Sequence, residues 1–100
     1  MIRDRTSTFI MRVAGDSMVG AGIAHGDEII VDRALTPRDG SVVVAVVEGE
    51  LLIRRLSMHD GVTSLVAHPP NAPSVAAEVT SLDADMSVWG VVTRCLHHVM

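Results

Sequence analysis

The apolar residues of this chain come in short runs, and turn-forming residues separate each run from the next. No segment keeps the 3.6-residue periodicity of an amphipathic helix. Short apolar runs between turn signals are typical of all-β proteins. The expected strands cover residues 8–13, 27–31, 41–47, 50–56, 62–67, 75–80 and 86–99. The pattern therefore predicts a mainly β fold, a small folded-over sheet or open barrel.

The connections between these runs carry their own signals. Glu48-Gly49 and Asp60-Gly61 are candidates for tight hairpin turns. Residues 15–26 are rich in glycine and small side chains, which indicates a loop that could include one helical turn. Gly90 lies inside the last expected strand, where a glycine is typical of a bulge or of a close approach by another segment.

Composition narrows the class of protein. The chain has 100 residues, 48% of them hydrophobic and 20% charged, which argues for one folded domain rather than disorder. The formal net charge of −4 argues against direct nucleic-acid binding, because phosphate contacts need a basic face. No apolar run reaches the ~18 residues of a membrane span, and a single cysteine makes a cytoplasmic setting the default. We expect no membrane association.

The segment Gly15-Asp16-Ser17-Met18 is the one stretch that indicates chemistry. A serine on a glycine-flanked loop after a strand can be held exposed at a sharp turn. Backbone N–H groups around such a serine can form an oxyanion hole. Taken alone the segment is weak evidence, because serine in a Gly-Asp-Ser turn is more often only a turn residue.

The wider sequence resembles a known family. The string GDSMVGAGIAHGDEIIVDR is similar to the nucleophile segment of the LexA/UmuD family, the S24 serine peptidases of the DNA-damage (SOS) response. DGSVVVAVVEGELLIRRL resembles that family's hairpin, PPNAP its Pro-x-Asn loop, and VWGVVTRCLHHVM its closing strand. The resemblance covers residues 8–100 and leaves residues 1–7 as an amino-terminal tail.

The resemblance implies a serine/lysine mechanism of self-cleavage. Ser17 would be the nucleophile, and the backbone N–H groups of Ser17 and Met18 would form the oxyanion hole. The general-base lysine position falls on Arg54, beside Arg55, and the chain has no lysine at all. Arginine stays protonated in proteins and offers only hydrogen-bond donors. We therefore predict impaired self-cleavage, with Arg54 donating to Ser17 or to a carboxylate such as Asp16 or Asp27.

The resemblance also implies partners. The usual substrate is an Ala-Gly or Cys-Gly bond ahead of the domain, cut under stimulation by the RecA filament, whereas only sixteen residues precede Ser17 here. The alternative is a non-catalytic interaction module resembling processed UmuD, a homodimer that binds a translesion DNA polymerase. We expect the homodimer to form through the carboxy-terminal strand, around Val88 to Leu96, as an exposed sheet edge that pairs with a second copy. A signal-peptidase relative is disfavoured, because Ala21-Gly22-Ile23 follows the Ser-Met pair in place of a proline.

No cofactor and no metal site are expected. His97 and His98 are adjacent, so on a strand they point to opposite faces and make a poor chelating pair. No histidine occupies the general-base position, and His25 is interpreted as an exposed loop residue. Cys95 is interpreted as a small hydrophobic residue. The remaining interpretations are turn and capping roles for Asp27 and Asp32, and packing for Trp89.

Overall fold

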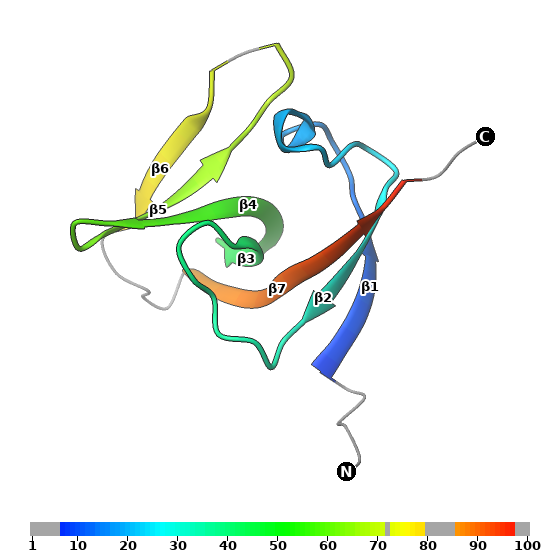
Figure 1. Ribbon diagram of the computed structural model, residues 1–100, viewed down its shortest axis with the longest axis horizontal. Coiled ribbons are helices and arrows are strands. Elements are labelled where there is room, and N and C mark those ends of the chain that lie inside the picture. The colour runs from blue at the N-terminus through cyan, green and yellow to red at the C-terminus, as the bar shows by residue number, and fades with distance from the viewer. Residues whose placement is uncertain (1–6, 72, 80–85, 98–100) are drawn as a thin grey trace.

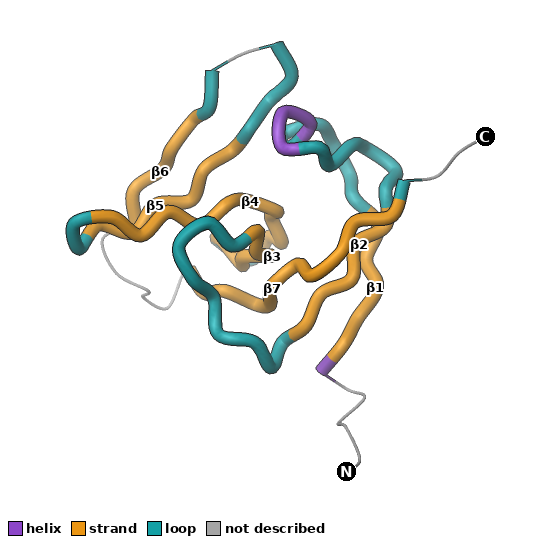
Figure 2. The backbone as a smooth tube through the Cα atoms, viewed as in Figure 1, coloured by secondary structure: helices purple, strands orange, loops and turns teal. Residues whose placement is uncertain are grey.

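The protein folds into a curved antiparallel sheet. The computed structural model describes residues 7–71, 73–79 and 86–97. The elements are β1 (Thr8–Arg12), the 3-10 helix η2 (Val19–Ala21), β2 (Glu28–Asp32), β3 (Val42–Val47), β4 (Glu50–His59), β5 (Val62–Ala67), β6 (Val75–Val79) and β7 (Met86–Leu96). The seven strands form one sheet in the order β1-β2-β7-β3-β4-β5-β6, which folds over on itself (Figures 1 and 2). This confirms the predicted mainly β fold.

Two tight turns set the register of the central hairpins. Glu48 and Gly49 have φ angles of 50° and 83° between β3 and β4, and Asp60 and Gly61 have 52° and 76° between β4 and β5. Positive φ at both central residues is the condition for a type I′ turn, whose twist matches that of the flanking strands. The turn β3–β4 pairs Val43 with Arg54, and this pairing fixes the face on which Arg54 lies.

β7 is an inner strand of the sheet. Its second half, from Val91 to Leu96, pairs with β2, and its first half, from Met86 to Val91, pairs with β3. The outer strands are β1 and β6. Our expectation that the carboxy-terminal strand is a sheet edge awaiting a partner was therefore wrong, because β7 lies between two strands that are far apart in sequence. The homodimer itself stays a prediction.

Gly90 allows β7 to cross close to β2. The β3–β7 register shifts between Val44 and Ala45, which pair with Gly90 and Val88 respectively. A Cβ atom on Gly90 would lie 2.5 Å from Cγ1 of Val31, closer than any relaxed contact. Both features predicted for a glycine at this position, a bulge and a close approach, are present.

Two groups of buried apolar side chains hold the sheet together. The first joins the start of the molecule to β2 and β3 (Val13, Met18, Ile23, Ile29, Val31 and Val44). The second lies under the central hairpins (Val43, Ala45, Leu56, Leu65 and Val91). Met18, which is 2% exposed, belongs to the first group. The residue after Ser17 is thus anchored in the core, and this anchor fixes the position of the serine.

Candidate functional site

Ser17 lies on the loop between β1 and β2, and hydrogen bonds within the loop hold it rigidly. The carbonyl of Asp16 accepts from the Val19 N–H at 3.2 Å, and the carbonyl of Met18 accepts from the N–H groups of Ala21 and Ile23 at 3.0 and 3.1 Å. The backbone N–H groups of Ser17 and Met18 take no part in these bonds. Their predicted role as an oxyanion hole stays a prediction.

The Ser17 loop also docks onto the connection between β5 and β6. The His68 N–H donates to the Ser17 carbonyl at 2.8 Å, and the Gly20 N–H donates to the His68 carbonyl at 2.6 Å. A Cβ atom on Gly20 would lie 2.9 Å from that carbonyl oxygen, so only glycine fits this contact without a shift. Figure 1 shows the two segments facing each other across the open side of the sheet.

Arg54 reaches Ser17 from β4. Its Nη1 donates to Ser17 Oγ at 3.0 Å and to the carbonyl of Ile53 at 2.7 Å. Arg55, the next residue on the strand, donates instead to the Gly40 carbonyl at 2.9 Å and to Nε2 of His68 at 3.3 Å. The side chain that the resemblance assigns to the family's lysine position therefore contacts the serine hydroxyl, and that side chain is a guanidinium.

A pocket of about 240 Å³ opens beside Ser17 and Arg54. Its walls are the end of β1 with the Ser17 loop on one side and the start of β4 on the other. The lining residues are mostly apolar (Met11, Arg12, Val13, Ala14, Ser17, Met18, Ile29, Val44, Leu51, Leu52, Ile53 and Arg54). β5 pairs with β4 only from Arg55 onward, so within the described ranges the start of β4 is paired on the β3 side alone. The pocket thus combines an open strand edge, apolar walls, the Ser17 hydroxyl and the two guanidinium groups of Arg12 and Arg54.

In the described part of the chain, each histidine contacts a group other than the Ser17 hydroxyl. His25 accepts from the Gly15 N–H at 2.8 Å, which ties the start of the Ser17 loop to its end. His59 pairs with the neighbouring Asp60, and His97 contacts Asp27. His68 accepts from Arg55 at Nε2, so Nδ1 carries the proton and donates to Ser74 at 2.9 Å. His98 lies outside the described residues.

The carboxylates take the capping roles predicted for them. Asp27, which is 5% exposed, accepts from the Ala24 N–H at 2.8 Å, and Asp32 accepts from the Ala34 N–H at 2.8 Å.

Trp89 packs edge-on against Phe9 at 5.1 Å, with the Arg33 guanidinium 4.5 Å from the centre of its ring. Of the side chains predicted as partners of Arg54, it is the Ser17 hydroxyl that accepts its hydrogen bond.

Comparisons with known proteins identify the family of this chain. The family model described as Peptidase S24-like matches residues 1–93. The chain belongs to this family. It is similar to the protein SamA of Salmonella typhimurium (33% identical over 96 residues) and to LexA repressor 1 of Xanthomonas campestris pv. campestris (40% over 84 residues). It is also 33% identical over 95 residues to the protein MucA of Salmonella typhimurium. These matches confirm the predicted LexA/UmuD membership.

This chain spans only part of the length of each relative. The matches cover 96%, 83% and 95% of this chain, but 64%, 40% and 63% of SamA, the LexA repressor and MucA respectively. In the ranges that the structure describes, no helix is long and apolar enough to cross a membrane.

The ionisation of Asp27 makes the free energy of unfolding of this S24-like domain depend on pH in the acid range. The hydrogen bond from the Ala24 N–H is the largest cause that lowers the pKa of Asp27, contacts with Cys95 and His97 add to it, and desolvation opposes it. A carboxyl group whose pKa is lower in the folded state stabilises the fold above its unfolded pKa. That stabilisation is lost as the pH falls through the folded pKa.

We expect Asp27→Asn to weaken the decrease in the free energy of unfolding as the pH falls below about 5. Asparagine can still accept from the Ala24 N–H, but it does not titrate. Urea unfolding from about pH 5 to about pH 2 should show the unaltered chain losing stability faster than the variant. Asp60→Asn, at an exposed turn, is the matched control. Parallel curves for the unaltered chain and Asp27→Asn would show that this carboxyl does not govern the acid response.

Proposed function

We propose that this chain is a LexA/UmuD-type S24 peptidase-like domain of the cytoplasmic DNA-damage response whose capacity for self-cleavage is impaired at Arg54. The observation that carries the proposal is the 3.0 Å hydrogen bond from Arg54 Nη1 to Ser17 Oγ. The bond places a permanent donor where a serine peptidase of the serine/lysine type needs a proton acceptor.

The chemistry follows from the direction of this bond. To attack a carbonyl, a serine must pass its proton to a base as the new bond forms. A guanidinium cannot accept that proton, and by donating to Oγ it occupies a lone pair that would attack the substrate. General-base catalysis typically contributes about 10² to 10⁴ in rate, so its loss leaves little turnover.

The test supplies the substrate separately. A peptide containing an Ala-Gly bond is incubated with the unaltered chain and with Ser17→Ala, from about pH 7 to about pH 10.5. We expect equal, background cleavage by the two proteins at every pH, as measured by mass spectrometry. Serine-dependent cleavage by the unaltered chain would refute the proposal, because some other group would then activate Ser17.

A second candidate function is a non-catalytic interaction module that resembles processed UmuD, a homodimer that binds a translesion polymerase. Exposed apolar side chains on the outer strand β1 favour it. Ile10 is 66% exposed and Phe9 is 36% exposed, on a strand that pairs only with β2 in the described ranges. An unpaired edge that carries apolar side chains is suited to contact with a second protein surface.

Sedimentation measurements test the self-association that this candidate requires. We expect the unaltered chain to sediment as a dimer at micromolar concentration, and Ile10→Lys to shift the equilibrium toward monomer. A chain that stays monomeric at all concentrations would contradict the homodimer, and it would have no bearing on whether Arg54 impairs cleavage.

A further inference from the structure

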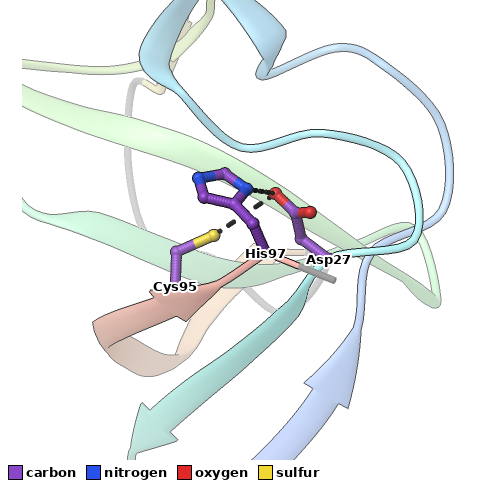
Figure 3. Close-up of side chains that lie close together, drawn as sticks. All are labelled: Asp27, Cys95 and His97. Carbon is purple, nitrogen blue, oxygen red and sulfur yellow. Dashed lines mark hydrogen bonds and ion pairs between the residues drawn. The ribbon is translucent and has the colours of Figure 1, made fainter. Parts of the chain in front are cut away.

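Three side chains with metal-ligating atoms meet where the residue before β2 lies opposite the residue after β7. Oδ2 of Asp27 lies 2.7 Å from Nδ1 of His97 and 3.5 Å from Sγ of Cys95. One ligand atom from each residue falls within 4.8 Å of the other two. Figure 3 shows Asp27 just before β2, with the side chains of Cys95, on β7, and His97, just after β7, turned toward it. None of the three lines the Ser17 pocket.

The strand register brings these residues together. Glu28 pairs with Leu96 and Ile29 pairs with Cys95, so Asp27 and His97 are opposite each other one step beyond the ladder. Cys95 lies on β7 and His97 follows its last residue, and since the two are two positions apart along an extended backbone they face the same side of the sheet. This is the spacing that the adjacent pair His97-His98 lacks. The position of Asp27 is fixed independently by its hydrogen bond from Ala24.

We propose that Asp27, Cys95 and His97 form a binding site for one divalent transition-metal ion of the zinc class. A carboxylate oxygen, an imidazole nitrogen and a thiolate sulfur are the donor types that Zn²⁺ takes in proteins. Three protein ligands leave a fourth position for water, as in open zinc sites. With a neutral imidazole, one carboxylate and one thiolate balance the two positive charges of the ion.

The required movement is small. Zinc–ligand bonds of about 2.0 to 2.3 Å in a tetrahedral site place the ligand atoms roughly 3.3 to 3.8 Å apart. The Asp27–Cys95 distance of 3.5 Å already fits, and the Asp27–His97 distance of 2.7 Å must lengthen by less than about 1 Å. The His97 side chain is 61% exposed, so it can rotate outward without disturbing the core.

Metal binding replaces the S–H bond of Cys95 with a sulfur–metal bond. In the metal-free protein, the S–H of Cys95 donates to Asp27, and burial together with that carboxylate raises the pKa of Cys95. On binding, the sulfur–metal bond forms, the S–H bond breaks and the proton passes to solvent. His97 gives up the Nδ1 hydrogen that it directs at Asp27, and the neutral ring carries its one proton on Nε2 while Nδ1 binds the ion. The ion then takes the place of the proton between the sulfur and the carboxylate.

Cobalt titration of the full 100-residue chain, in a phosphine reductant that does not chelate metals, tests the site. Co²⁺ bound to a thiolate gives an intense charge-transfer absorption that oxygen and nitrogen ligands alone do not produce. We expect the band to saturate at one equivalent and to be abolished by competition with Zn²⁺. Cys95→Ser should remove the band, and His97→Ala should weaken binding by about 100-fold.

Matched histidine variants separate this site from incidental binding. His98→Ala and His59→Ala should bind Co²⁺ as the unaltered chain does. Circular dichroism should show that Cys95→Ser and His97→Ala remain folded, because both side chains are at least partly exposed. Binding without the thiolate band, or equal loss in His97→Ala and His98→Ala, would overturn the proposal. These outcomes are independent of whether Ser17 is active.

Discussion

Replacing Arg54 with lysine is expected to make the chain cleave an Ala-Gly peptide at least about 100 times faster than the unaltered protein does. The Ser17 loop is already fixed by backbone hydrogen bonds, within the loop to the Met18 carbonyl and across to His68. The substitution therefore supplies only the missing base. A partly buried lysine has a lowered pKa, and its neutral form can accept the serine proton. The rate should therefore rise with pH until the lysine is fully neutral. Mass-spectrometric peptide assays measure the rate.

Arg55→Lys is the matched control for this gain of activity. It makes the same chemical change one residue along β4, where the side chain contacts Gly40 and His68 rather than Ser17. We expect no activity from it, and none from the double variant Ser17→Ala/Arg54→Lys. An inactive but folded Arg54→Lys variant would mean that more than the base has been lost from the site.

Gly90→Ala is expected to lower the free energy of unfolding by about 1 to 3 kcal/mol. The new methyl group would lie 2.5 Å from Cγ1 of Val31, a fully buried side chain at the centre of the first core group. Val31 is β-branched and packed in the core, so relieving this contact requires its side chain to leave its rotamer or β2 to move away from β7. Urea denaturation of the two proteins measures the difference.

A double-mutant cycle identifies the cause of that loss. Val31→Ala removes the atom that the new methyl group meets, so the combination with Gly90→Ala should cost less than the sum of the two single changes. Strict additivity would place the cost of Gly90→Ala elsewhere, for example in the backbone at the bulge.

The strands could be predicted from the sequence because each is bounded by a strong turn signal. Residues 62–67 were expected as a strand and β5 spans Val62–Ala67, while Glu48-Gly49 and Asp60-Gly61 adopt the backbone that hairpin turns require. The strand order could not be predicted. Whether β7 ends up at an edge or between β2 and β3 depends on long-range pairing, which local patterns do not encode.

The same limit applies to the sites. Ser17 and Arg54 were found through a resemblance over residues 8–100, and the β3–β4 register then brings them within hydrogen-bonding distance. The docking of His68 onto the Ser17 loop carries no sequence signal, since it consists of backbone hydrogen bonds. The meeting of Asp27 with Cys95 and His97 was also missed. The Cys-x-His spacing of Cys95 and His97 was the available clue. The third residue of the cluster, Asp27, is more than sixty residues away in the sequence.

The reactivity of the Ser17 hydroxyl toward an organophosphorus probe tests most directly the claim that Arg54 leaves this serine without a base. Intact-mass and peptide-level mass spectrometry would follow adduct formation on the unaltered chain and on Arg54→Lys. The account predicts that Ser17 of the unaltered chain reacts no faster than an ordinary surface serine, and that Arg54→Lys accelerates the reaction with rising pH. Rapid labelling of Ser17 in the unaltered chain would contradict it.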